Sequence, residues 1–218
     1  LVSEFIGYDS FSSSAKIIKY RRVNDKYEVL LDKTPFYAES GGQVSDVGEL
    51  SAPDFSFLVE DVQNINDEFI HIGTLRYGNL DDVYNLKAAI DNDRRQKIRR
   101  NHTATHLLHQ SLKEVLGNHV QQSGSLVASN SLRFDLSHYE QITSKNIKEI
   151  EDKINRIILD NVEVSTDIKD YKLACSEGAV RLFGEKYGDI VRVVSIPGFS
   201  MELCGGTHVN NTGDIGCF

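Results

Sequence analysis

The sequence predicts an α+β protein with a β-rich N-terminal part and a C-terminal part that mixes helices with strands. In residues 15–90, short alternating or β-branched runs are separated by turn residues, as expected of antiparallel strands. After residue 90 the apolar positions follow the helical period, in residues 94–117 and 144–161. We therefore predict two domains, residues 1–90 and residues 91–218.

Five runs in the N-terminal part have the composition of strands, namely residues 15–20, 27–31, 55–62, 69–75 and 83–90. Short strands with frequent turns are typical of a small antiparallel barrel or sandwich. Residues 34–50 differ, because a Pro-Phe-Tyr strand turns sharply at Ser-Gly-Gly-Gln. From the residues alone, this segment is either a hairpin whose glycines take a positive φ or a turn that brings its backbone close to a binding site.

The C-terminal part contains two clear helices. Residues 91–93 carry aspartates that can cap the first helix, and Gly117 can end it. The second helix has an apolar stripe of Ile147, Ile150, Ile154, Ile157 and Ile158. We also predict strands at residues 124–127, 132–136, 190–196 and 200–203 and a short helix at residues 171–177. Helices packed on one side of an antiparallel sheet would make this domain α+β.

The first helix carries a pair of histidines with metal-ligand spacing. His102 and His106 are four residues apart, so their imidazoles stand on one face of a helix and can close on one cation. These histidines lie roughly opposite the helix's own apolar stripe, which includes Leu107, Leu108 and Leu112. The pair alone is compatible with two core histidines, and a metal site requires further ligands.

A second half-site follows about a hundred residues later, in Cys204-Gly205-Gly206-Thr207-His208. The two glycines permit a tight turn in which the thiolate and the imidazole point inward together. Two histidines joined by a cysteine and a histidine complete four ligands. This mixture of nitrogen and sulfur favours Zn²⁺ over magnesium or calcium, which prefer oxygen, and we place it ahead of iron.

Polar side chains surround the predicted metal ligands in the sequence. Hydroxyls and amides are present at Thr103, Thr105, Gln121, Gln122, Ser123 and Ser125, and Glu202 is an acid that could handle a proton. Basic residues precede the histidines at Arg94, Arg95, Lys97, Arg99 and Arg100. This strip either meets a phosphate-bearing substrate or is an ordinary solvated helix face.

Composition and motifs exclude several other classes. The net charge of -8 argues against a protein whose whole surface attracts nucleic acid, and no apolar run is long enough to span a membrane. The histidine pair lacks the glutamate of the metalloprotease motif, because positions 103 and 105 are threonines. No phosphate-binding glycine loop or nucleophile elbow is present.

Cys175, Cys204 and Cys217 are too few for a disulfide framework. We therefore expect a reducing, cytoplasmic compartment in which Cys204 is a metal ligand.

Six longer motifs together identify a family resemblance. They are TPFYAESGGQVSDVGEL, HTATHLLH, HVQQSGSLV, LRFDLSH, LFGEKYGD and MELCGGTHVNNTGDIG. In this order they resemble the editing domain of alanyl-tRNA synthetase, which freestanding alanyl-tRNA editing proteins share. The resemblance covers essentially the whole chain, from Phe5 to Phe218.

The resemblance implies a barrel like that of translation factors followed by a zinc-containing deacylase domain. Its substrate would be the acceptor end of tRNA(Ala) wrongly charged with serine or glycine. The metal ligands carried over are His102, His106, Cys204 and His208, and Gln122 occupies a family position implicated in editing. Thr105, Ser123, Arg99 and Arg100 are further candidates for substrate contacts, and Glu39, Ser40 or Gln43 would line a cleft.

The resemblance also implies missing partners and leaves alternatives. The aminoacylation domain, with its ATP and alanine sites, and the C-terminal domain would belong to a longer parent chain, so we expect no aminoacylation here. The editing domain of threonyl-tRNA synthetase shares the histidine pair and a similar Cys-to-His turn. A module that binds tRNA without catalysis around a structural zinc is the alternative from another class, since four protein ligands close the coordination sphere.

Overall fold

The computed structural model describes residues 3–181 and 187–218, which form two compact units. The first unit contains the described residues of Leu1–Ser40 together with Val44–Arg95, and the second contains Gly41–Gln43 and Gln96–Phe218. Compared with the predicted domains, the first unit extends to Arg95 and a short glycine segment joins the second. Residues 182–186 of the LFGEKYGD motif lie outside the described residues.

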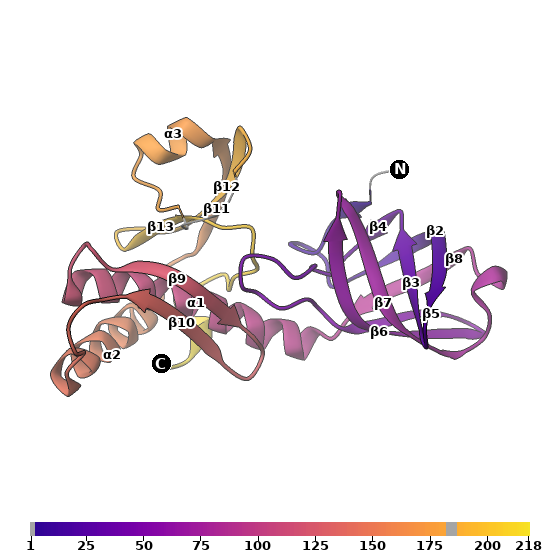
Figure 1. Ribbon diagram of the computed structural model, residues 1–218, viewed down its shortest axis with the longest axis horizontal. Helices are drawn as coiled ribbons and strands as arrows, with labels where there is room; N and C mark the ends of the chain where they lie inside the picture. The colour runs from indigo at the N-terminus through magenta and orange to yellow at the C-terminus, as the bar shows by residue number, and fades with distance from the viewer. Residues whose placement is uncertain (1–2, 182–186) are drawn as a thin grey trace. The chain divides into compact units, whose positions relative to one another are not determined.

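The first unit is a closed six-stranded barrel, which Figure 1 shows in indigo and magenta. The strand order is β2-β3-β7-β6-β5-β8, and all neighbours are antiparallel. Barrel, rather than sandwich, is therefore the correct alternative. The strands are β2 (Ser12–Val23), β3 (Lys26–Leu31), β5 (Gly48–Ala52), β6 (Phe55–Ile65), β7 (Glu68–Tyr77) and β8 (Asn85–Ile90).

Alternating side chains fill the barrel because successive residues of a strand point to opposite faces. The fully buried members of this core include Val29, Leu31, Phe36, Leu50, Phe55, Phe57, Val59 and Val62. Strand β5 begins within residues 34–50, the segment compatible with a hairpin, and runs on to Ala52. Two short strands, β1 (Glu4–Phe5) and β4 (Lys33–Thr34), pair in parallel beside the barrel, and a 3-10 helix (Leu80–Asp82) precedes β8.

A buried ion pair fixes the last residue of the first unit. The Arg95 guanidinium is 1% exposed and bonds the Asp46 carboxylate and the carbonyl oxygens of Gly7 and Pro35. Every one of these partners is itself in the first unit. Arg95 therefore cannot belong to a phosphate-binding strip, and the expectation for this residue was wrong.

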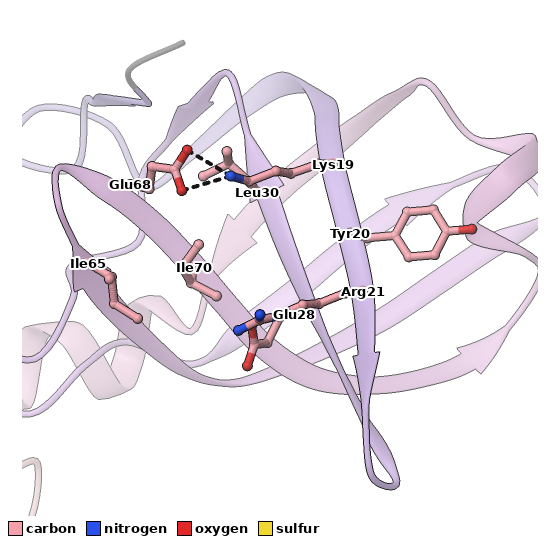
Figure 2. Close-up of a pocket in the computed structure, with 8 residues that line it drawn as sticks. All are labelled: Lys19, Tyr20, Arg21, Glu28, Leu30, Ile65, Glu68 and Ile70. Atoms are coloured by element: carbon pink, nitrogen blue, oxygen red, sulfur yellow. Dashed lines mark hydrogen bonds and ion pairs between the residues drawn. The ribbon is translucent and has the colours of Figure 1, made fainter.

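The barrel carries a cavity of about 320 Å³ on its outer side (Figure 2). Leu30 and Ile70 are among the apolar side chains that line it, and ion pairs join Lys19 to Glu68 and Arg21 to Glu28 at its edge. Its remaining lining residues are Tyr20 and Ile65. None of the predicted site residues lines this cavity.

The second unit combines helices with two antiparallel sheets (Figure 1). Its sheets are β9-β10 and β11-β12-β13. The sequence analysis did not predict strand β11. The elements are α1 (Asn92–Leu116), β9 (Gln121–Val127), β10 (Leu132–Ser137), α2 (Ser144–Leu159), β11 (Ser165–Asp170), α3 (Tyr171–Ser176), β12 (Ile190–Ile196) and β13 (Ser200–Leu203), with a 3-10 turn at Thr212–Ile215.

Both long helices have the predicted signals at their ends. The Asp91 carboxylate accepts a hydrogen bond from the Arg94 backbone N–H at 2.9 Å, and Gly117 follows α1 with φ of 113°. Thr143 caps α2 in a reciprocal capping box with Asn146. Among the described residues, no helix combines the length and the apolar run that crossing a lipid bilayer requires.

The apolar stripes of α1 and α2 meet strand residues in one core. Its buried members are Leu107, Leu112, Val120, Ile150, Ile154, Ile158 and Ile196, and Phe134 and Leu136 of β10 pack against them. Ile147 departs from the predicted stripe and is 49% exposed, because it lies in the first turn of α2, near the edge of this contact. Because the apolar side of α1 is buried in this core, His102 and His106 lie on the side of the helix that faces away from it.

Candidate metal centre

Helix α1 presents two imidazoles one turn apart. His102 and His106 are both buried, and their ring centroids are 5.3 Å apart. Spacing of four residues brings side chains to one helix face, as the sequence predicted. Burial of two imidazoles on the polar side of a helix requires partners for their nitrogens.

The remaining two candidates come from the turn after β13. Pairing of β13 with β12 delivers Cys204, whose backbone N–H donates to the Arg192 carbonyl at 3.0 Å. The Cys204 Sγ atom lies 3.4 Å from His102 Nε2 and 3.3 Å from His208 Nε2. The four donor atoms of His102, His106, Cys204 and His208 all lie within 4.8 Å of one another.

These separations suit a four-coordinate ion. Metal bonds of about 2.0–2.3 Å in a tetrahedron place the donor atoms roughly 3.3–3.6 Å apart. The two sulfur-to-nitrogen distances, 3.4 and 3.3 Å, agree with that spacing. The group could therefore hold one metal ion.

Gly206 makes the approach of the two half-sites possible. A Cβ atom at this position would lie 2.0 Å from His102 Cε1 and 2.9 Å from Gln43 Oε1. At Gly205, by contrast, an added Cβ would meet nothing within 4 Å. The sequence indicated that the turn needs glycine, and the structure assigns the steric need to the second glycine.

Hydrogen bonds hold the outer nitrogens of two of the histidines. Gln43 Oε1 lies 2.7 Å from His102 Nδ1, and Thr103 Oγ1 lies 3.1 Å from His208 Nδ1. With Nδ1–H donated outward, each Nε2 keeps its lone pair for the centre of the group. Gln43 Oε1 also accepts the Thr207 backbone N–H at 2.9 Å, so one amide binds both half-sites.

A buried carboxylate stands behind the third histidine. Glu202 Oε1 accepts a hydrogen bond from His109 Nδ1 at 3.1 Å, and Glu202 Oε2 is 3.7 Å from His106 Nδ1. The latter distance exceeds a hydrogen bond, and His106 Nδ1 has no hydrogen-bond partner within the described residues. Glu202 thus faces the outer side of the ligand group.

The charges of this group favour a cation at its centre. Burial raises the pKa of the Cys204 thiol, but His102, His208 and His106 outweigh it and hold that pKa well below its usual value. Burial lowers the pKa of His106, whereas Glu202 and Cys204 raise it to about 9. Burial and His102 keep the pKa of His208 well below its usual value.

The pKa of Glu202 is raised by burial but lowered more by His106 and His109, so the carboxylate is charged. A half-buried thiolate and a buried carboxylate therefore lie beside the histidines. Deprotonated sulfur and a neutral imidazole are the forms that bind a metal, so a metal ion would displace the proton that the raised pKa of His106 favours.

Arg192 clamps the backbone of the Cys204 turn. Its Nη1 donates to the carbonyl oxygens of Cys204 and Gly206, both at 2.8 Å. Because its own carbonyl accepts the Cys204 N–H, Arg192 holds that residue from both sides. Sequence reasoning missed this role, since an arginine in a β-strand carries no motif.

The predicted substrate residues have different surroundings. The Thr105 hydroxyl is buried and donates to the Asn101 carbonyl at 2.8 Å, one turn earlier in α1. Gln122 is half-buried and donates to Ser125 Oγ at 3.2 Å. Ser125 packs against Gly42, where an added Cβ would lie 2.3 Å from its Oγ. Gln122 thus adjoins the glycine segment that carries Gln43.

Arg99 and Arg100, the two basic candidates for substrate contacts, have different surroundings. Arg99 Nε donates to the His208 carbonyl, and its Nη2 donates to Asn210 Oδ1 at 2.9 Å, so this side chain supports the turn. Arg100 and Ser123 are exposed. Gln43 and Thr103 contact the ligand group, and His109 bonds Glu202 behind His106, in ways the sequence did not specify. For His109 a signal existed, because it follows His106 by three residues on the same helix face.

Comparison with known proteins connects both units to one enzyme class. A family model described as tRNA synthetases class II (A) matches residues 2–94. A second, described as the threonyl and alanyl tRNA synthetase second additional domain, matches residues 191–218, which include Cys204 and His208.

Curated relatives extend the match over nearly all of the chain. The chain is 48% identical over 225 residues to the alanine-tRNA ligase of Thermoanaerobacter sp. (strain X514), covering 99% of this chain and 26% of the relative. It is 49% identical over 215 residues to that of Pseudothermotoga lettingae, covering 98% and 25%. For Legionella pneumophila (strain Lens) the identity is 50% over 225 residues, covering 99% and 26%.

The chain spans about a quarter of the length of these relatives. All three are alanine-tRNA ligases, which favours the alanyl over the threonyl alternative. With the barrel, the His-Cys ligand group and these matches in agreement, the chain matches a segment of the alanyl-tRNA synthetase family over nearly its whole length.

Proposed function

We propose that this chain is the editing part of an alanine-tRNA ligase, which hydrolyses the ester of tRNA(Ala) mischarged with serine or glycine. The observation that carries the proposal is the convergence of His102, His106, Cys204 and His208 within 4.8 Å. Relatives of this chain charge tRNA according to their name, and a hydrolytic site in such a protein has wrongly charged tRNA as its natural substrate.

Zinc is the metal that this donor set fits best. Three imidazoles and a thiolate are borderline and soft ligands, which oxygen-preferring cations do not select. Bound zinc would polarise the ester carbonyl or orient a water molecule.

The chain's own residues hold this site in place. Gln43 and Thr103 fix the tautomers of His102 and His208, and Arg192 and Arg99 hold the Cys204–His208 turn. Glu202 keeps a proton on His109 Nδ1 and lies on the outer side of His106. We therefore assign Glu202 a positioning role in place of direct proton transfer to substrate.

Preferential hydrolysis of the seryl ester requires a polar group that forms a hydrogen bond with the seryl hydroxyl. A site built around such a hydrogen bond loses a partner when alanine is presented, and hydrolysis of the correct ester slows. Gln122 is the stronger candidate, because the Thr105 hydroxyl already donates to Asn101. Lys97 and Arg100 are the exposed residues of the basic strip and are the candidates to contact a phosphate of the acceptor end.

Single-turnover hydrolysis of Ser-tRNA(Ala) and Ala-tRNA(Ala), with protein in excess, tests this function. We expect faster release of serine than of alanine, and Gln122→Ala should reduce the difference between the two rates. Excess protein compensates for weak binding by a part of a longer enzyme. Equal rates for the two esters, or no hydrolysis by folded and zinc-loaded protein, would refute the proposed function.

One observation favours a second candidate. Four protein donors close the coordination sphere, which is usual for a structural zinc site. In that case the unit would bind tRNA without hydrolysing it. Zinc removal would then unfold the second unit, and Gln122→Ala would leave no kinetic effect.

A further inference from the structure

Three aromatic side chains meet on the surface of the second unit, outside the four-ligand group. His119 follows α1, while His138 and Tyr139 follow β10. The two imidazole rings are nearly parallel, with centroids 5.1 Å apart and planes 19° apart. The Tyr139 ring lies 4.6 Å from His119 and 5.4 Å from His138, and Tyr139 is 77% exposed.

The rings are held in place by the protein itself. His119 Nε2 and His138 Nδ1 are 2.8 Å apart, which is a hydrogen bond between the imidazoles. The β9-β10 ladder ends at the pair Gln121 and Ser137, so it brings both histidines to the same end of the hairpin. Gly117 leaves room for the His119 ring, since an added Cβ would lie 2.9 Å from its Nδ1. The aromatic surface therefore exists before any ligand binds.

The chemistry of this surface matches a nucleobase. Exposed neighbours along the chain are polar, namely Asn118, Gln121, Ser137 and Glu140. Protein interfaces centre on buried apolar side chains, whereas an unpaired base needs a flat ring to stack on and polar atoms at its edge. The ring nitrogens outside the imidazole pair, His119 Nδ1 and His138 Nε2, supply such atoms.

We propose that His119, His138 and Tyr139 form a stacking platform for an unpaired nucleotide of bound RNA. The proposal rests on the proposed function in taking tRNA as that RNA. Gln122 follows His119 by three residues, which corresponds to roughly 10 Å of extended chain. An acceptor end whose ester lies near Gln122 would thus bring a nucleotide close to its 3′ terminus to the platform.

The test is binding of an RNA hairpin that contains the acceptor stem and the unpaired 3′ end of tRNA(Ala). One unpaired position carries 2-aminopurine, whose fluorescence falls when it stacks on an aromatic ring. We expect quenching by the wild-type chain and a loss of affinity of about 5- to 100-fold for Tyr139→Ala. Tyr139→Phe keeps the ring and should retain both affinity and quenching.

Tyr84→Ala is the matched control, because Tyr84 is similarly exposed at 63% but lies in the barrel unit. It should bind the hairpin as the wild type does. Unchanged affinity and quenching for Tyr139→Ala would overturn the platform. So would a result in which Tyr139→Ala weakens only the association of this chain with the rest of the synthetase, since the surface would then be a protein interface.

The binding assay needs no hydrolysis, which separates this proposal from the function proposed above. A protein that quenches 2-aminopurine through Tyr139 but releases no amino acid would refute the deacylase and support the platform. Hydrolysis of the seryl ester with no effect of Tyr139→Ala on binding would do the reverse.

Discussion

The hydrogen bonds at the Nδ1 atoms of two histidines orient the ligand group for metal binding. His102 and His208 turn Nε2 inward because Gln43 and Thr103 occupy their Nδ1 atoms. Partners of this kind fix the ring orientation of a metal-binding histidine and strengthen it as a ligand. The residues behind the ligands should therefore influence metal affinity even though they do not contact the ion.

Gln43 gives the sharpest test of that expectation. Replacing it with Ala removes the acceptor for His102 Nδ1 and for the Thr207 N–H, so we expect zinc affinity to fall by about 10- to 100-fold. Gln43→Glu keeps an acceptor and should lose less. Competition with a chromophoric chelator measures the affinity.

A matched control for this experiment is Gln110→Ala, which removes a glutamine of α1 whose amide bonds Glu114. It should leave zinc affinity unchanged. If Gln43→Ala binds zinc as tightly as the wild type, the outer hydrogen bonds do not tune this site.

A histidine inside the barrel predicts a pH dependence of stability. His71 is fully buried, donates from Nδ1 to the Val29 carbonyl, and accepts from the Thr34 hydroxyl at Nε2. Burial lowers its pKa from 6.5 to about 4. Between those values the unfolded chain takes up a proton that the folded barrel does not, so stability falls as the pH falls.

The lost stability amounts to ~3 kcal/mol over this interval, by the free energy of one pKa unit. Urea unfolding at several pH values, for the wild type and for His71→Gln, measures it. The variant should be less stable near pH 7 but should lose less stability between pH 6.5 and 4. Parallel pH curves for the two proteins would contradict the assignment, because other titrating groups are common to both.

Elements differ in how well the sequence predicted them. Helices α1 and α2 and strands β12 and β13 were predicted because their periods and end signals are local. Strand β11 was missed, since it is exposed on most residues and pairs with β12 through its backbone, so it has no apolar alternation. Of the candidate site, two spaced motifs identified the four side chains that the structure brings together.

The supporting residues could not be predicted in the same way. Gln43 meets His102 and Thr207 across 59 and 164 positions of chain, and no local pattern encodes such contacts. Arg95 was expected at a solvated or phosphate-binding face, but it is buried and bonds Asp46. The sequence around a basic residue does not indicate which distant carboxylate it will pair with. Long-range polar contacts are thus the part that required the structure.

The turn after β13 needs a glycine at position 206. Gly206→Ala would place a Cβ 2.0 Å from the His102 ring, and the turn must shift to relieve this contact. We expect at least a 10-fold loss of zinc affinity, as for other disturbances around metal ligands. The absorption of cobalt-substituted protein should also lose its thiolate-to-metal band.

Gly205→Ala is the matched control, because the same methyl group there would meet nothing within 4 Å. It should retain zinc affinity and the cobalt spectrum. Equal behaviour of the two variants would mean that the steric argument is wrong.

The chain consists of two units, and helix α1 contributes residues to both. Its residues up to Arg95 belong to the barrel unit, and those from Gln96 onward belong to the second unit. Each unit has its own core. The chain spans about a quarter of its curated relatives, so tRNA(Ala) and the other domains of a synthetase remain proposed partners.

We propose that hydrolysis depends on a metal held by the four candidate ligands. The most direct measurement is the single-turnover rate of Ser-tRNA(Ala) hydrolysis as zinc is removed with a chelator and restored in steps. The rate should rise in proportion to bound zinc. Cys204→Ala should neither bind zinc nor hydrolyse the ester, while Cys217→Ala, which removes an exposed thiol, should do both. Full activity in folded protein without metal, or in Cys204→Ala, would show that hydrolysis does not depend on this metal site.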